Sequence, residues 1–329
     1  MVQLMVSCTQ FTKASAHAAS RRTAALAMTL LFSLFTAAPL LAADQQTASV
    51  ARTKVERGIT TLNEAIELHA KTLGITSMDL SYRFFGGGME VFSLDTQAIL
   101  TPNTYEIASQ IETRGIADSI FKGSLHTQAR GLITKSGPYL HAYRQDYRGK
   151  SGEQRVFMVR DPKDTYAVMA TPRNGVHAQP GFSYNSLKGT VDPLTASIYT
   201  ALNTTKDPCE GKITIFDGRR VFNLRFTKDG SDDMDASRVG GYKGHVQRCK
   251  VVFKPIAGYA RKWLIKEAKN PMKPFTVWIA EIKTPKSTVL NKPLLIPVKV
   301  LVETSYMNAT AHLTQAIIDG DTLVDAKLR

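Results

Sequence analysis

Short runs of alternating apolar and polar residues fill the chain between residues 78 and 170. They cover 78–84, 89–94, 105–111, 125–132, 138–147, 153–160 and 165–170, with Gly, Pro, Asn or Asp in the gaps. A period of two is typical of strands that bury one face, and strands at such regular spacing are typical of an antiparallel meander. The strand–helix–strand alternation that a parallel sheet requires is missing. The pattern therefore predicts a mainly β fold.

The segment from 192 to 226 combines a short apolar helix, a loop with a cysteine and two strands. Asp192-Pro193 predicts the helix start, because Asp accepts hydrogen bonds from free N–H groups and Pro suits the first turn. Asp217-Gly218 lies between two alternating runs and predicts a hairpin turn. Further strands are expected at 247–255, 275–283, 297–305 and 312–318. We predict a single β-rich domain over residues 77–329.

The first 43 residues have the order of a secretory signal peptide. Lys13, Arg21 and Arg22 precede an apolar run that ends at the small residues Ala42 and Ala43. The run is close to the shortest length that spans a bilayer, so an uncleaved anchor is the alternative. We expect cleavage, a periplasmic location and, since no cysteine follows the cleavage site, no lipoprotein anchor. Residues 44–76 are predicted to form a mobile arm with a short amphipathic helix at 60–73.

Cysteine usage agrees with export. Cys8 lies in the signal segment, which leaves Cys209 and Cys249 in the mature chain. An even pair in an oxidising compartment predicts a disulfide, and the C-x-x-C spacing of redox-active pairs is absent. Loss of chain entropy in the unfolded state predicts a stabilisation of about 4 kcal/mol for a loop of this length.

The charge is strongly positive. The formal net charge is +14, and removal of Lys13, Arg21 and Arg22 with the signal segment lowers it to +11. A positive excess favours anionic partners such as acidic lipid headgroups, lipopolysaccharide phosphates or cell-wall polymers. Solubility alone is the alternative explanation, because the basic residues between 243 and 273 are scattered. Export argues against nucleic acid as a partner.

Motifs of known catalytic and metal sites are missing from the sequence. No two of the six remaining histidines lie within four positions of each other, and G-x-S-x-G does not occur. Gly86-Gly87-Gly88 lacks the Lys-Ser/Thr of a phosphate loop and predicts a turn. Asp232-Asp233 opens a segment without the Gly and Glu of a calcium loop and predicts a solvated acidic turn. We expect a non-enzymatic protein without cofactor or metal.

Two residue groups leave a binding role open. Arg219 and Arg220, beside the predicted hairpin tip, could hold a carboxylate or phosphate, although exposed hairpin arginines usually hold nothing. The aromatic residues mostly occupy strand positions that predict core packing. In a sheet that curls without closing, they would instead line a concave face that an apolar ligand could enter.

Three segments resemble the exported bacterial family known as domain of unknown function 3108. They are DPLTASIYTAL (192–202), CEGKITIFDGRRVFNLRF (209–226) and CKVVFKPIAGY (249–259), and the similarity extends over most of residues 80–305. The resemblance implies a single large antiparallel sheet, curled into an incomplete barrel or β-spiral like that of envelope lipoprotein carriers, with a few short helices. It implies an envelope association but no specific activity.

These observations support three functional hypotheses. The first is a periplasmic protein that binds an apolar or amphipathic envelope component and supports envelope integrity. The second is a scaffold that meets envelope proteins through its sheet edges and holds no small ligand. The third, an enzyme acting on envelope glycans or lipids, requires converging acidic or histidine residues that the sequence does not indicate.

Overall fold

The structure is a computed structural model that describes residues 75–150, 152–179, 182–202, 207–283, 293–303 and 307–326. The signal segment and the amphipathic helix predicted at 60–73 lie outside these ranges. Among the described residues, no helix is both long enough and apolar enough to cross a membrane.

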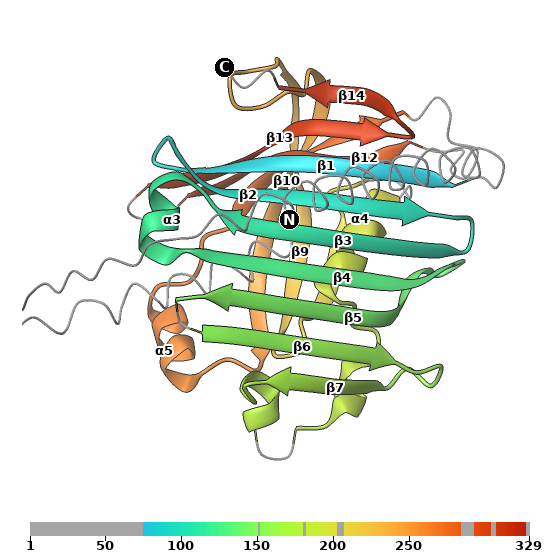
Figure 1. The fold of residues 1–329 in the computed structure, drawn as a ribbon, viewed down its shortest axis with the longest axis vertical. Coiled ribbons are helices and arrows are strands. Elements are labelled where there is room, and N and C mark those ends of the chain that lie inside the picture. The colour runs from blue at the N-terminus through green and yellow to red at the C-terminus, as the bar shows by residue number, and fades with distance from the viewer. Residues whose placement is uncertain are drawn as a thin grey trace, which may run out of the picture.

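One antiparallel sheet of 14 strands organises the described chain (Figure 1). Its first strands are β1 (Thr76–Gly86), β2 (Met89–Leu100), β3 (Thr104–Thr113), β4 (Gly123–Thr134), β5 (Gly137–Gly149), β6 (Gly152–Arg160) and β7 (Tyr166–Thr171). The later strands are β8 (Gly211–Phe216), β9 (Val221–Met234), β10 (Gly244–Ala257), β11 (Phe275–Ile282), β12 (Leu294–Glu303), β13 (Asn308–Ile318) and β14 (Asp321–Asp325). The meander predicted for residues 78–170 is confirmed.

The strand order joins the two ends of the domain in the middle of the sheet. The order is β7-β6-β5-β4-β3-β2-β1-β13-β12-β11-β10-β9-β8, with β14 on the free part of β13. The first strand therefore pairs with β13, and the two edges, β7 and β8, come from the middle of the chain. β9 and β10 cross behind the front strands at a steep angle (Figure 1). The sheet is curled but not closed into a barrel, which confirms the predicted fold class.

A single helix fills the space inside the curl. The segment that links the two sheet edges contains two short 3-10 helices, Gly175–Ala178 and Tyr184–Leu187, and then helix α4 (Pro193–Leu202). α4 lies between the front strands and the strands behind them (Figure 1) and contacts β4, β5, β8 and β12. Leu194 and Ile198 are buried in the largest apolar cluster of the described chain. The core therefore forms around a helix enclosed by one sheet.

Several local elements differ from the sequence-based expectations. Helix α3 (Gly115–Phe121) forms within 113–121, a segment that the sequence leaves open between a helical turn and a strand connection, while α5 (Arg261–Lys269) and β14 were not predicted. Asp232 and Asp233 lie within β9 instead of an acidic turn, because their strand pairs with β10 as far as Gly244. Among the aromatic residues expected in the core, Phe157 is exposed because it faces outward on β6.

Candidate functional site

The two free edges of the sheet meet along a seam that the α4 segment closes. Val191, just before α4, forms a parallel bridge with Ile215 of β8. The N–H of Val191 donates to the carbonyl of Thr214 at 3.0 Å, and the N–H of Phe216 donates back to the carbonyl of Val191 at 2.9 Å. The entrance to α4 therefore covers part of the β8 edge and satisfies its backbone groups.

Arg219 fastens the tip of the β8–β9 hairpin to the other edge. Its guanidinium is buried and donates to the carbonyls of Arg155 (3.0 Å), Thr171 (2.8 Å) and Pro172 and to the side-chain oxygen of Asn174. All four acceptors belong to β6, β7 or the loop after β7. Burial lowers the pKa of Arg219, and the carboxylate of Asp217 opposes that shift. Arg219 therefore acts as a structural clamp: its two terminal nitrogens bond within the fold, and its Nε, which has no hydrogen-bond partner among the described residues, is buried.

The hairpin turn has a local reason for its sequence. The carboxylate of Asp217 accepts from the N–H groups of Arg219 and Arg220, at 2.8 and 2.6 Å. Gly218 has a φ of 84°, and a Cβ there would lie 2.2 Å from a methyl carbon of Val156 on β6. A side chain is thus excluded both by the backbone conformation and by the seam. The guanidinium of Arg220 lies over the ring of Tyr259, 5.7 Å from its centre.

A series of buried hydrogen bonds fixes the start of α4. The carboxylate of Asp192 accepts from the N–H groups of Leu194 (2.9 Å) and Thr195 (3.1 Å) and from the hydroxyl of Thr195. That hydroxyl also forms a 2.6 Å hydrogen bond with the hydroxyl of Tyr105 on β3. Pro193 occupies the first position of the helix. Burial raises the pKa of Asp192 to about 6, against the lowering effect of these hydrogen bonds.

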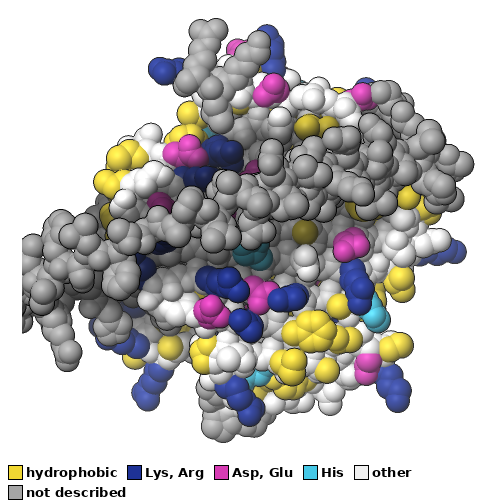
Figure 2. All heavy atoms as spheres, viewed as in Figure 1, with side chains coloured by type: hydrophobic (Ala, Val, Ile, Leu, Met, Phe, Trp, Pro, Cys, Tyr) yellow, Lys and Arg dark blue, Asp and Glu magenta, His cyan; other side chains and the backbone are white. Residues whose placement is uncertain are grey.

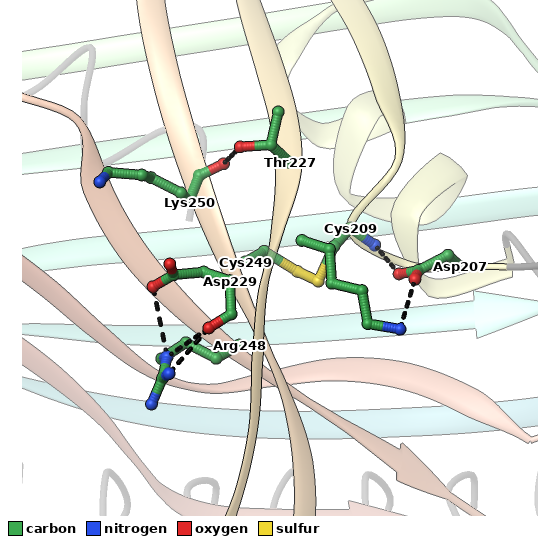
Figure 3. Close-up of a disulfide and its surroundings, with 8 residues drawn as sticks. Asp207, Cys209, Thr227, Asp229, Arg248, Cys249 and Lys250 are labelled. Carbon is green, nitrogen blue, oxygen red and sulfur yellow. Dashed lines mark hydrogen bonds and ion pairs between the residues drawn. A yellow bond between two sulfur atoms is a disulfide. The ribbon is translucent and has the colours of Figure 1, made fainter.

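A disulfide fixes the chain where it leaves α4. Cys209 and Cys249 are bonded, with their Cα atoms 5.0 Å apart, which confirms the predicted pair. The bond links the loop before β8 to β10, two strands away (Figure 3). Both cysteines are fully buried. Asp207 accepts from the N–H of Cys209 at 2.8 Å and pairs with Lys228 at 3.1 Å, so the loop is held from both sides.

A partly open cavity of about 80 Å³ lies beside α4, on the side away from the seam. Its helix wall carries Leu194, Ile198 and Ala201 together with Ser197 and Thr200, whose hydroxyls donate to carbonyls within the helix. Its sheet wall comes from β1, β2, β3, β9 and β12. Tyr82 and Phe226 are the aromatic residues in the lining, and no charged residue takes part. The expectation that a curled sheet would present aromatic residues to an interior space thus holds for these two. Burial raises the pKa of the Tyr82 hydroxyl well above its usual range, so the lining is neutral.

Hydroxyl groups interrupt the apolar sheet wall along one row. Thr96 on β2 and Ser109 on β3 line the cavity and are bonded to each other at 2.8 Å. The same row continues through Thr127 on β4 to Gln145 on β5, in direct register. On β3, Ser109 alternates in step with Ile107 and Ile111, so all three side chains point to the inner face of the sheet. This row of hydroxyl groups was not predicted from the sequence. The wall therefore offers neutral hydrogen-bonding groups within an apolar surface.

No convergent set of titratable residues accompanies this cavity. Within the part of the chain that the structure describes, no group of three or more His, Cys, Asp and Glu is arranged to hold a metal ion. The residues predicted from sequence, Asp192, Pro193, Cys209, Asp217, Gly218 and Cys249, all belong to the seam and to the fastening of the α4 segment. The cavity residues lie beside them and form a separate site.

The family model described as "Protein of unknown function (DUF3108)" matches residues 77–314. The chain belongs to this family. The match covers the curled sheet from β1 into β13, including the α4 segment and the disulfide, so it confirms the resemblance drawn from the sequence. The search of curated proteins gave no match.

Two solved structures show a more distant likeness. A beta-barrel-like protein of domain of unknown function DUF1849 from Brucella abortus is 10% identical, with a TM-score of 0.41, over 75% of this chain and 98% of that one. A DUF1329 family protein from Desulfovibrio piger is 8% identical, with a TM-score of 0.17, over 77% of this chain and 88% of that one. Neither supplies a functional residue for the cavity.

Proposed function

We propose that this protein is an exported, non-enzymatic binding protein that holds the apolar part of an envelope lipid beside α4. The observation that carries the proposal is the cavity itself: it is apolar, lacks charged lining residues and opens partly to the outside. A well-packed interior rarely leaves space larger than a few waters. A neutral, underfilled space beside an otherwise tightly fastened helix is therefore the feature of this fold that a ligand would explain best.

The size of the cavity restricts the ligand. At about 80 Å³ it is smaller than the engineered cavity of about 150 Å³ that binds benzene. It has room for the end of an alkyl chain but not for a whole lipid. The remainder of a bound lipid would extend through the open side, so the expected ligand is amphipathic and linear. Thr96 and Ser109 share one hydrogen bond, so one of their two hydroxyl protons remains to donate to an ester or hydroxyl oxygen near the chain, without favouring an anionic group over a neutral one.

The compartment is part of the proposal. Its support is the order of charged, apolar and small residues in the first 43 positions and the disulfide, which persists in oxidising compartments. Export would bring the chain to the lipids of the cell envelope. Cell fractionation, together with the mass of the purified chain, tests this step: a mass that retains residues 1–43 in a soluble cytoplasmic fraction would contradict it.

The binding step is tested with an extracted and an added ligand. Organic extraction of the purified chain followed by mass spectrometry is expected to recover an acyl-containing lipid. Binding of cis-parinaric acid, a fluorescent fatty acid, is expected to weaken by about tenfold or more when Ala98→Leu and Ala201→Leu fill the cavity from opposite walls. The probe would then have to enter a space that the leucines already occupy, which costs about 1–3 kcal/mol of binding free energy.

The matched control adds the same atoms elsewhere. Ala167→Leu places an identical side chain on the exposed part of β7 and is expected to leave probe binding unchanged. Absence of any extracted lipid, together with equal probe binding by the cavity-filling and control variants, would refute the proposal. The alternative of a scaffold acting through sheet edges gains no support here, because the α4 segment already pairs with part of the β8 edge.

A further inference from the structure

Helix α5 presents its apolar residues to the outside. It covers Arg261–Lys269 and contains no buried residue. Leu264 is 42% exposed and Ile265 is 49% exposed. In a helix of a soluble protein the apolar stripe normally faces the core. Leu264 and Ile265 depart from this rule, and packing within the described chain does not account for their position.

The attachment of α5 shows why these two side chains stay outside. The ring of Trp263 stacks on Tyr259 with centres 4.5 Å apart, and Tyr259 contacts Phe253 of β10 at 6.2 Å. Phe253 in turn contacts Phe222 in the core at 5.3 Å. The helix is thus held to the sheet by one tryptophan. Since each residue turns by about 100° around a helix axis, Leu264 and Ile265 lie on sides that Trp263 does not attach.

Cations surround the exposed apolar pair. Arg261, Lys262, Lys266 and Lys269 are all exposed, and none of them takes part in the ion pairs found among the described residues. The single acid of the helix, Glu267, accepts from the backbone N–H of Met272 at 2.7 Å. The surface of α5 therefore combines apolar side chains with four cations and one acid, and the cations form no ion pair among the described residues.

A second exposed apolar pair has the opposite electrostatic setting. Phe157 on β6 and Met169 on β7 lie side by side, 42% and 69% exposed. The arginines beside them are compensated: Arg144 pairs with Asp146 at 2.6 Å, and Arg155 pairs with Glu153 at 3.0 Å. Figure 2 shows this mixture of basic and acidic side chains over the front strands. Exposed large apolar residues also occur elsewhere, among them Ile116 and Ile120 on α3 and Val252 and Ile256 on β10. Helix α5 combines two adjacent ones with four cations that lie outside the ion pairs of the described residues.

We propose that α5 is a docking element for an anionic lipid membrane surface. Apolar side chains that enter the headgroup boundary and cations that meet acidic headgroups are the two components of interfacial helix binding. The docking surface is formed by Leu264, Ile265 and the four cations of α5. It is separate from the cavity beside α4 and does not rest on the function proposed for that cavity.

The test measures binding of the chain to vesicles. The chain is expressed with its own N-terminal segment, and its mass after purification establishes its N-terminus. It is expected to co-sediment with vesicles of equal parts phosphatidylglycerol and phosphatidylcholine, and to bind pure phosphatidylcholine vesicles far less. Leu264→Ser with Ile265→Ser is expected to weaken binding about tenfold. Lys262→Gln with Lys266→Gln and Lys269→Gln is expected to weaken it about a hundredfold.

The controls repeat both changes on the compensated surface. Phe157→Ser with Met169→Ser removes an equally exposed apolar pair, and Arg144→Gln with Arg148→Gln and Arg155→Gln removes the same charge. Both controls are expected to bind vesicles like the parent chain. Equal losses in the α5 and control variants would show that binding depends on overall charge or hydrophobicity, and would overturn the proposal.

A spectroscopic measurement locates the helix at the membrane. The chain has two tryptophans, so Ile265→Trp in a chain that also carries Trp263→Phe and Trp278→Phe leaves a single reporter on the exposed side of α5. Its fluorescence is expected to be quenched by brominated lipid in anionic vesicles. Co-sedimentation without quenching would place another part of the chain at the membrane, and stable dimers whose loss follows Leu264→Ser would assign the surface to a second copy. Either result would refute the docking role of α5.

Discussion

The two sides of helix α4 differ in how they meet the sheet. On the seam side, Asp192 and the Arg219 clamp hold the helix and the hairpin with several buried hydrogen bonds each. On the other side, Ile198 and Ala201 border a cavity of about 80 Å³ with an apolar wall. The same ten-residue helix is thus fastened on one side and loosely packed on the other.

This difference distinguishes residues that hold the fold in place from residues that could bind a ligand. Buried polar groups with several partners fix a position, because each lost hydrogen bond leaves an unsatisfied group in a dry interior. An apolar void does not fix the position of its neighbours, and it costs packing energy unless something fills it. The comparison therefore predicts large stability effects from changes at the seam and small ones from changes at the cavity.

The largest effect is expected from Arg219→Met. The substitution keeps the apolar volume but leaves four oxygens of the β6–β7 edge without their donor. Since each buried unsatisfied group costs about 1–3 kcal/mol, and some will reach water, we expect a loss of about 5 kcal/mol. Urea unfolding followed by circular dichroism measures it. Arg220→Met, next to it but less buried and lying over the ring of Tyr259, is the control and should cost less than about 1 kcal/mol.

The disulfide is expected to rank second. Cys209→Ser with Cys249→Ser removes a cross-link of sequence separation 40 and should lower the free energy of unfolding by about 4 kcal/mol. Reducing agent should destabilise the parent chain to a similar extent and leave the double variant unchanged. If the parent melts equally with and without reductant, the disulfide contributes nothing and the α4 segment is held by the seam alone.

Sequence patterns predicted the parts of the fold that depend on local chemistry. The alternation that buries residues such as Ile107 and Ile111 predicts strand β3, and Asp192-Pro193 predicts the start of α4. The pairing of Cys209 with Cys249 followed from their number alone. Each of these features depends on a few neighbouring residues or on the number of cysteines, so the sequence alone predicts it.

The remaining features depend on contacts between distant segments. Nothing near Arg219 in the chain indicates acceptors 47 and 64 positions away, so its sequence neighbourhood suggested an exposed hairpin arginine. The cavity depends on how strongly the sheet curls around α4, which strand periodicity does not encode. Helix α5 was missed because its apolar residues do not follow a core-facing period; a basic helix with Leu264 and Ile265 is instead the pattern of a surface-binding helix.

The third prediction concerns the pH dependence of the seam. Burial gives Asp192 a pKa of about 6 in the folded chain, against 3.8 in the unfolded chain. Between these values the folded chain binds more protons, so stability is fully present below pH 3.8 and is lost as the pH rises through about 6. The loss should amount to about 3 kcal/mol. Comparing urea unfolding of the parent and Asp192→Asn across this range isolates the group: the variant should lack this slope, and equal slopes would contradict the assignment.

The smallest effect is expected at the cavity. Ala98→Leu and Ala201→Leu add carbon atoms to a space that exists already, so the gain from burying them offsets any strain. The free energy of unfolding should change by no more than about 1 kcal/mol in either direction, although the same variants should lose the fatty-acid probe. A loss of several kcal/mol, comparable to that of Arg219→Met, would mean that the cavity wall is as tightly packed as the seam. The two sides of α4 would then be equivalent, and the structural basis for a ligand beside the helix would be gone.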